Sequence, residues 1–552
     1  MDRKTLLAFA LIAIVLILTP WYMNLVAPLP EDDSTIGPDI VESTNSPQAY
    51  YELEANAPES GQNSTDPLPL EVRVNSSLYT ATISSRAGGS FLSFVLNGYD
   101  KFDSTKVDLI DENNLKNLVL SFVSFDGDLV SLDNNWSLVS GDKNVNARSQ
   151  ERRLVFQTTF RGNLIRKTFT FFPETYQIGL EISFSSPEKF VSRGQFHLDW
   201  SGGVASTEKN KKDEYTYFKG YAYLGDELLE AGAPEGSVET QRQTGETRWT
   251  AVRSKYFISA LIPNSPAIGG EVSGTRLDGR PNYSTRLRQR ASDSVGHTLY
   301  MGPLDYNQIE ALGVGLENTM NLGWAIIRPL GQLVTWSLKK MYGIIPNYGV
   351  VVILFAIIVK ILLNPLTKKQ MVSTRNMQAL QPQIQKLKEK YKNDPQKLNK
   401  AQMALFKEKG VNPMGGCLPL LLQMPILISF FTVFRSTIEF RGAPFFGWIT
   451  DLSLPDTLLT IAGFNLNVLP FIMGATMFLQ QKYMSPTGGA SEGQQKFMLY
   501  GMNIFFLFLF YSFPSGLNLY YSVFNFLSII QQKYFLPVVS SPGTRKTTKV
   551  KK

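Results

Sequence analysis

The sequence predicts a polytopic α-helical membrane protein with six transmembrane helices, a large β-sandwich domain outside the membrane and a helical hairpin in the cytoplasm. Three observations predict this fold class: six apolar runs approach the length that a bilayer requires, one long acidic block shows the alternation of short β-strands, and Lys and Arg cluster beside the apolar runs. The chain has 552 residues, which is enough for two or three domains.

The apolar runs are candidate spans, because a hydrocarbon core about 30 Å thick needs roughly 20 helical residues. The first could instead be a cleaved signal peptide, since Arg3 and Lys4 precede it. It continues past Pro20 without an A-x-A cleavage site, so we prefer an uncleaved signal anchor. The six runs are Leu6–Val26, Tyr348–Leu363, Cys417–Phe434, Phe464–Gln480, Phe497–Phe513 and Leu517–Ile530.

Charge is segregated along the chain. Residues 28–345 carry a net charge of −9 and the remainder carries +16, which together give +7. Residues 365–412 hold eleven Lys and Arg against three acids, and residues 535–552 hold five and no acid. Because basic loops stay in the cytoplasm, we expect both segments and both termini there, and the acidic block on the other side.

The acidic block has two parts. Residues 28–69 contain nine acids, no Lys or Arg and many Pro, Ser and Asn, which predicts a disordered linker. Residues 70–320 alternate apolar and polar residues in stretches such as "RLVFQTTF" and "YQIGLEISF", separated by turn residues. Many short strands over such a length favour a large β-sandwich.

Two amphipathic segments follow. Residues 321–345 mix Trp336 with Arg328 and Lys339, which favours a helix lying on the outer membrane face; a helix packed on the β domain is the alternative. In the cytoplasmic loop, Asp394 and Pro395 predict an N-cap and first turn, and so a helical hairpin. Its basic face could bind anionic headgroups or ribosomal RNA, or could simply be solvated. Its first helix has an apolar stripe of Met377, Leu380, Ile384, Leu387 and Tyr391.

These patterns divide the chain into thirteen segments. They are a signal anchor (1–27), the linker (28–69), the β-sandwich (70–320), an interfacial helix (321–345), helix 2 (346–364), the cytoplasmic hairpin (365–415), helix 3 (416–436), an outer loop (437–463), helix 4 (464–483), a cytoplasmic loop (484–496), helix 5 (497–513), helix 6 (516–534) and a basic tail (535–552).

Lys360 lies inside the second apolar run, where a charge costs at least about 2.5 kcal/mol. None of the six runs contains Asp or Glu, so Lys360 has no counter-ion there. Its side chain could snorkel to the cytoplasmic headgroups, because only three residues separate it from Leu363. Asn364 and Thr367, however, follow at four and seven residues and share its helix face.

The last run has its own polar stripe, and Gln423 adds a polar group to the third run. Polar stripes in lipid usually indicate hydrogen bonds between helices. A lysine without an acid fits that explanation poorly, whereas a water-filled recess open to the cytoplasm would solvate both the lysine and the amides. The stripe consists of Asn518, Tyr521, Ser522, Asn525, Ser528 and Gln532.

The chain resembles the YidC family of membrane protein insertases over nearly its whole length. Four motifs carry the resemblance in order and spacing: "NPLTKKQ", "NPMGGCLPLLLQMPI", "LQQKYMSP" and "FPSGLNLYYSVFN". The resemblance implies a location in the bacterial inner membrane and a periplasmic position for the β-sandwich. It also implies a hydrophilic groove, open to the cytoplasm and to lipid, that receives a nascent membrane protein. By position, the resemblance places Lys360, Gln423, Tyr520, Tyr521 and Asn525 in this groove, and the polar helix faces add Asn364, Thr367 and Asn518 as candidate groove residues.

The resemblance also implies partners. Nascent membrane proteins are the expected clients, inserted alone or with the Sec translocon and its accessory subunits, and a monomer is expected to suffice. The hairpin and the basic tail are expected to engage ribosomes, and the candidate ribosome- and lipid-binding residues of the tail are Arg545, Lys546, Lys549, Lys551 and Lys552. The groove charge in this family is typically arginine, so Lys360 keeps the charge and loses the planar two-pronged grip on a carboxylate.

No enzymatic activity, cofactor or metal is expected. The single cysteine excludes an internal disulfide, and two histidines make a zinc site improbable. We weighed two other functions. A secondary transporter would show paired charges or broken helices in repeated halves. The second is a membrane-anchored periplasmic glycan-active protein. The β block contains many carboxylates, but the sequence has no P-loop, H-E-x-x-H motif or nucleophile elbow.

Overall fold

The computed structural model describes residues 68–111, 116–320, 327–392, 394–410, 418–461, 463–484 and 497–534. They fall into two compact units, which comprise residues 43–321 and residues 1–42 with 322–552. The predicted signal anchor, nearly all of the acidic linker, the loop after Met484 and the basic tail lie outside the described residues.

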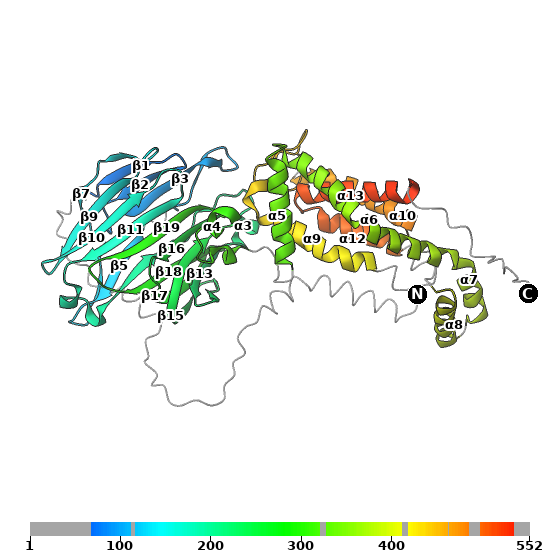
Figure 1. Cartoon of the computed structure of the whole chain (residues 1–552), viewed down its shortest axis with the longest axis horizontal. Coiled ribbons are helices and arrows are strands. Elements are labelled where there is room, and N and C mark those ends of the chain that lie inside the picture. The colour runs from blue at the N-terminus through cyan, green and yellow to red at the C-terminus, as the bar shows by residue number, and fades with distance from the viewer. Residues whose placement is uncertain are drawn as a thin grey trace, which may run out of the picture. The chain divides into compact units, whose positions relative to one another are not determined.

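The unit of residues 43–321 is built from β-sheet (Figure 1). One sheet has five strands in the order β4-β3-β2-β1-β8, and a 14-stranded sheet follows β6-β5-β12-β18-β17-β15-β16-β19-β11-β10-β9-β7 with β13 and β14 beside β15. The elements are β1 (Glu71–Asn75), β2 (Tyr79–Ser84), β3 (Ser90–Asp100), β4 (Lys106–Asp108), β5 (Asn117–Val123), β6 (Leu129–Ser131), β7 (Ser137–Ser140), β8 (Asn144–Asn146), β9 (Arg152–Phe160), β10 (Asn163–Phe171), β11 (Gln177–Phe184), β12 (Gln195–Trp200), α3 (Lys211–Tyr215), β13 (Lys219–Leu224), β14 (Glu227–Glu230), β15 (Val238–Arg253), β16 (Phe257–Pro263), β17 (Ala267–Leu277), β18 (Arg280–Arg290), β19 (Val295–Pro303) and α4 (Tyr306–Glu310).

The core of this unit lies where the two sheets meet. Strand β10 buries every second residue, as the period of a half-buried strand requires. The ring of Phe169, on the inward face of β10, packs edge to face on the ring of Phe91 of β3 in the other sheet, with 6.2 Å between the ring centroids. This contact supports the predicted sandwich of strands with alternating apolar residues.

Lys167 also lies on the inward face of β10 and is fully buried. Its Nζ donates hydrogen bonds to the backbone carbonyl oxygens of Ala87, at 2.7 Å, and Leu118. The Trp136 ring lies 5.3 Å from the same nitrogen. Burial lowers the pKa of Lys167 to about 7. This lysine therefore ties β10 to the loop between β2 and β3 and to strand β5, which alternation alone would not connect.

The described part of the other unit is mainly helical. Its elements are α5 (Arg328–Tyr342), α6 (Tyr348–Ala379), α7 (Gln381–Lys390), α8 (Pro395–Glu408), α9 (Leu418–Ser436), β20 (Thr457–Ile461), β21 (Phe464–Asn467), α10 (Leu469–Met484), a π-helical turn (Phe497–Gly501), α12 (Met502–Phe510) and α13 (Ser515–Tyr534). Aromatic side chains fill its core: the Tyr520 ring stacks on Phe430 at 4.1 Å between centroids, and the Phe430 and Phe434 rings also stack.

Within the described residues, one helix is long and apolar enough to cross a membrane, over Tyr348–Pro365. Met424–Ser436 and Leu499–Phe510 form shorter apolar helices. The first predicted span lies outside the described residues. The count of six transmembrane helices therefore stays a prediction.

Helix α6 does not end where the second span was predicted to end. It continues through Pro365 to Ala379, so the start of the predicted cytoplasmic hairpin belongs to the same helix. A proline inside a helix removes one backbone hydrogen bond and favours a kink, but here it does not end the helix. The hairpin proper is formed by α7 and α8, and the predicted N-cap is confirmed: Asp394 Oδ1 accepts from the backbone N–H of Lys397 at 3.1 Å.

The fourth predicted span also begins later than expected. Residues from Phe464 to Asn467 form β21, which pairs with β20, and α10 begins at Leu469. Asn467 and Asn465 accept hydrogen bonds from threonines of β20, which stabilises the hairpin at 2.8 and 2.7 Å. The apolar content of this run does not distinguish the short strand β21 from the start of the helix.

Asp456, buried before this hairpin, organises the start of α10. One carboxylate oxygen accepts from Trp448 Nε1 at 3.1 Å and from the backbone N–H groups of Val468 and Leu469 at 2.9 and 2.7 Å. Backbone N–H groups at a helix start lack intrahelical partners, and the helix dipole favours a negative charge there. Asp456 therefore links the loop before the hairpin to α10.

Helix α5 packs on α9 and α6, burying Val334 and Leu338 in the core of the helical unit. Lys339 forms an ion pair with Glu439, which follows α9, at 2.8 Å. Leu333 and Trp336 on another face are 56% and 60% exposed. Large exposed apolar side chains beside a buried face are what an interfacial helix requires.

Candidate functional site

The candidate site lies where α6 packs against α13. Lys360 Nζ donates a hydrogen bond to Ser528 Oγ at 2.7 Å, and the same nitrogen lies 4.6 Å from the centroid of the Phe524 ring. Ser528 Oγ in turn donates to the carbonyl oxygen of Phe524 at 2.8 Å, so its lone pairs remain available to the lysine. Lys360 is only 7% exposed.

A second polar contact joins the same helices further along α6. Gln531 Nε2 donates to Asn364 Oδ1 and, at 3.3 Å, to Thr367 Oγ1. The three residues predicted to share a face, Lys360, Asn364 and Thr367, thus all meet α13. We call them, with Ser528 and Gln531, the α6–α13 polar row.

The sequence reasoning did not include Ser528 and Gln531 among the groove residues. Ser528 belonged to the predicted stripe, so its 3–4 spacing was the available signal. The predicted stripe passes from Ser528 to Gln532, four residues on, whereas the structure uses Gln531, three residues on; a helix of 3.6 residues per turn places both positions on neighbouring parts of one face.

Exposure varies along the polar row. Lys360 is buried, Thr367 is partly buried, and Asn364 and Lys368 are exposed. Gln531 remains buried at 8% exposure. The row therefore combines a buried cation with one exposed member, Asn364, which lies on the side of Lys360 that leads toward the hairpin.

Lys360 forms no ion pair with a carboxylate of the described residues; its hydrogen bond and ring contact are with Ser528 and Phe524. A hydroxyl and a ring face attract the ammonium without cancelling its charge. This arrangement differs from snorkelling, because the side chain bonds across to α13.

The other predicted groove residues are placed differently. Asn518 and Tyr520 have no exposed surface: Asn518 Nδ2 donates to the carbonyl oxygen of Phe510 at 3.1 Å, and Tyr520 stacks on Phe430. In this structure they connect and pack the helices, which does not fit direct lining of an open groove. Tyr521 and Asn525, 8% and 7% exposed, are also largely buried.

Two sets of predicted residues cannot be placed. The side chain of Gln423, in the first turns of α9, lies outside the described residues, as does the basic tail with Arg545, Lys546, Lys549, Lys551 and Lys552. Among the described residues, no group of three or more His, Cys, Asp or Glu could hold a metal ion.

Comparison with protein families matches both units. The model described as "60Kd inner membrane protein" matches residues 340–540, and the model described as "YidC periplasmic domain" matches residues 71–333. The first covers the α6–α13 polar row. The second covers the five-stranded and the 14-stranded sheets.

Individual relatives match over nearly the full length. A membrane protein insertase YidC from Prosthecochloris aestuarii is 34% identical over 579 residues, covering 98% of this chain and 96% of the relative. One from Chlorobaculum parvum is 33% identical over 564 residues, covering 98% and 95%. Among solved structures, an active YidC insertase with its first transmembrane domain resolved is 19% identical, covers 84% of this chain and 92% of its own, and has a TM-score of 0.37.

Proposed function

From the premise that this chain belongs to the YidC family of membrane protein insertases, we propose that it inserts nascent membrane proteins through a polar recess formed by the α6–α13 polar row, open to the cytoplasm and to lipid. The observation that carries this mechanism is Lys360, a buried cation whose contacts in the described residues are a hydroxyl and an aromatic ring.

Lys360 supplies the attraction in this mechanism. An ammonium has three donors, and the hydrogen bond to Ser528 uses one of them. A permanent acid partner would neutralise the lysine and remove its field. With a neutral partner, the charge stays available to an acidic group in the extracellular segment of a client, and interaction through a low-dielectric surrounding is stronger than in water.

The amides of the polar row supply hydrogen bonds. A hydrophilic segment crossing lipid carries backbone N–H and C=O groups that cost several kcal/mol when left unpaired. Asn364 and Gln531, which now bond to each other, offer both donors and acceptors that can be exchanged for those of the client. The row thereby replaces part of the water that the segment leaves behind.

Bilayer thinning lowers the remaining barrier. The apolar part of α6, Tyr348–Leu363, has 16 residues and rises about 24 Å, against a hydrocarbon core of about 30 Å. A span shorter than the core favours local thinning of the bilayer. The client's own apolar segment then leaves sideways into lipid along exposed helix faces.

The partners follow from this mechanism. Nascent membrane proteins are the clients. The basic hairpin α7–α8 and the basic tail attract ribosomal RNA or anionic headgroups, and the Sec translocon with its accessory subunits shares some clients. Both termini lie in the cytoplasm, and the β-sheet unit lies in the periplasm.

The test is site-specific photo-crosslinking with a stalled nascent membrane protein. A crosslinking residue at exposed Asn364 should capture the client, whereas one at Leu362, 70% exposed on another face of the same helix, should capture lipid and little client before insertion. Equal capture at both positions, or capture at Leu362 alone, would contradict a recess along the polar row.

A further inference from the structure

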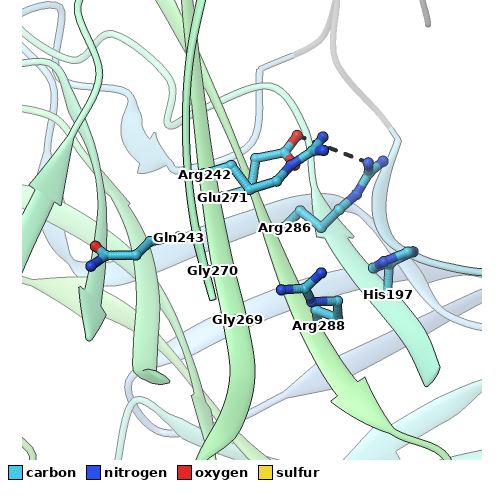
Figure 2. A pocket seen from close by; sticks show the side chains of 8 residues that line it. All are labelled: His197, Arg242, Gln243, Gly269, Gly270, Glu271, Arg286 and Arg288. Carbon is cyan, nitrogen blue, oxygen red and sulfur yellow. Dashed lines mark hydrogen bonds and ion pairs between the residues drawn. The ribbon is translucent and has the colours of Figure 1, made fainter. Parts of the chain in front are cut away.

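A cleft on one face of the 14-stranded sheet contains Arg288, a cation that forms no ion pair with a carboxylate of the described residues (Figure 2). The cleft has a cavity volume of about 110 Å³ and opens to solvent. Strands β12, β18, β17 and β15, which are neighbours in this order, supply its lining. The lining residues are His197, Arg242, Gln243, Gly269, Gly270, Glu271, Arg286 and Arg288.

Strand register arranges the charged side chains in two rows. In the first row, Asp199 is opposite Arg286, Arg286 is opposite Glu271, and Glu271 is opposite Arg242. Acids and bases alternate, and the ion pairs form: Arg286 Nε lies 2.6 Å from Asp199 Oδ1, and Arg242 Nε lies 2.5 Å from Glu271 Oε2. This row is electrically balanced.

The second row, two residues along each strand, has no acid. His197 is opposite Arg288, Arg288 is opposite Gly269, and Gly269 is opposite Thr244. A glycine occupies the position that corresponds to Glu271 in the first row. Arg288 is therefore the one charged member of a row whose other members are neutral at pH 7.

Gly269 is also what makes room for Arg288. A Cβ added at Gly269 would lie 2.6 Å from Arg288 Nη2 and 2.9 Å from Nε, so the guanidinium lies directly over the glycine. Arg288 Nη2 donates to Thr244 Oγ1 at 2.5 Å. Its Nε is buried and has no hydrogen-bond partner among the described residues.

His197 contributes a second unpaired atom. Its Nδ1 is likewise buried without a hydrogen-bond partner among the described residues. Burial, followed by the positive charges of Arg286 and Arg288, lowers the pKa of His197 to about 4, so the ring is neutral at pH 7 and adds no charge. Figure 2 shows the side chains of His197, Arg286 and Arg288 on the same side of their strands.

We propose that this cleft binds a carboxylate group of a ligand, held by Arg288 and His197 above Gly269. A charged acceptor would satisfy the free Nε of Arg288. The lining arginines exceed the nearby acids, Glu271 and Asp199, by a single charge. A singly charged carboxylate matches this excess, whereas a doubly charged phosphate would leave one negative charge without a partner.

The two histidines provide the readout. Full-length protein labelled with 13C in histidine reports on His197 in the cleft and on His297, which is buried elsewhere with its Nε2 bonded to Gln289. Titration with acetate should shift the His197 signals saturably in the millimolar range and leave those of His297 unchanged. Inorganic phosphate should bind more weakly than acetate.

Two variants and a control test the assignment. Arg288→Gln should weaken acetate binding about tenfold or more, because a charge-assisted hydrogen bond is lost. Gly269→Ala keeps every charge, but its Cβ displaces the guanidinium, so it should also weaken binding. Arg290→Gln, on the same strand and exposed, should bind acetate like the parent protein.

The carboxylate could come from a small acid or from an acidic side chain of a polypeptide. Tighter binding of glucuronate than of acetate would identify the first source, and tighter binding of an N-acetylated, amidated aspartate would identify the second. Absence of a saturable His197 shift, unchanged affinity in Arg288→Gln, or tighter binding of phosphate would each overturn the proposal.

Discussion

Lys360 of α6 and Ser528 of α13, 168 residues apart in sequence, are joined by a 2.7 Å hydrogen bond from an ammonium to a neutral hydroxyl. The hydroxyl holds the lysine in place without neutralising it. Its charge is therefore preserved inside a packed pair of helices, at a cost to stability that a hydrophobic residue would not impose.

Reversal of this charge should impair insertion. We expect Lys360→Glu to lower the insertion of small clients with acidic extracellular segments by about tenfold or more, equivalent to at least about 1.4 kcal/mol in barrier height, because attraction becomes repulsion. Lys360→Arg keeps the charge and should be tolerated. Protease protection of radiolabelled clients in proteoliposomes measures both. Normal insertion by Lys360→Glu would contradict the attraction step.

Removal of the charge should raise the stability of the protein and lower its insertion activity. In Lys360→Met the helix pair loses an uncompensated ammonium, and Ser528 Oγ still donates to the Phe524 carbonyl. We expect the free energy of unfolding to rise by about 1 to 3 kcal/mol while insertion of acidic clients falls. Denaturant titration in detergent micelles and the same insertion assay decide this. A less stable Lys360→Met would show that the lysine serves packing.

Asp456 should contribute strongly to the stability of the helical unit. Asp456→Ala leaves Trp448 Nε1 and two N–H groups at the start of α10 without their acceptor. We expect a loss of at least about 2 kcal/mol, seen as a lower midpoint of thermal unfolding. Thr450→Ala, exposed in the same loop, is the control. Equal midpoints for the two variants would mean that water replaces the carboxylate.

Lys167 should make the stability of the β-sheet unit depend on pH. Burial lowers the pKa of its amine from 10.5 to about 7, so between these values the unfolded chain binds one proton more than the folded chain. The contribution of Lys167 to the free energy of unfolding should therefore rise with pH in this window, by about 1.4 kcal/mol per unit, and be constant below it. Lys167→Met should lower the measured slope by this amount. An unchanged slope would mean that the folded amine keeps its proton.

The periplasmic unit should be dispensable for basic insertion. A deletion from about Asn75 to Pro303 would leave most of β1 without its partner strands, so removal of Glu71–Thr319 is the cleaner variant. We expect a stably expressed deletion to insert simple clients at near-normal levels, because the α6–α13 polar row lies wholly in the other unit. Loss of all insertion by this variant would mean that insertion also depends on the β-sheet unit, contrary to this assignment.

Periodicity in the sequence was sufficient to predict the elements whose environment follows from their own residues. The alternating strands of the β-sheet unit, the Asp394 cap and the shared face of Lys360, Asn364 and Thr367 are examples. Each depends on spacing along one segment, which a single sequence displays.

Features that depend on distant partners could not be predicted in this way. A tyrosine has both an apolar ring and a hydroxyl, so the sequence does not reveal that the Tyr520 ring stacks on Phe430. Likewise, neither the pairing of Gln531 with Asn364 nor the balance of charge around Arg288 is visible until strands and helices are aligned. The second predicted span ends at residue 364 because the apolar run ends there, and apolar content does not reveal that the same helix continues to Ala379.

The continuity of α6 has a mechanical meaning. At 32 residues, and about 48 Å if straight, it is one continuous helix that carries Lys360 twelve residues from its start and meets α7 beyond its C-terminal end. Pro365 has no backbone N–H to donate within the helix, so α6 bends most readily there, and a bend at Pro365 would change the direction of the hairpin α7–α8 relative to the helix segment that carries the ammonium.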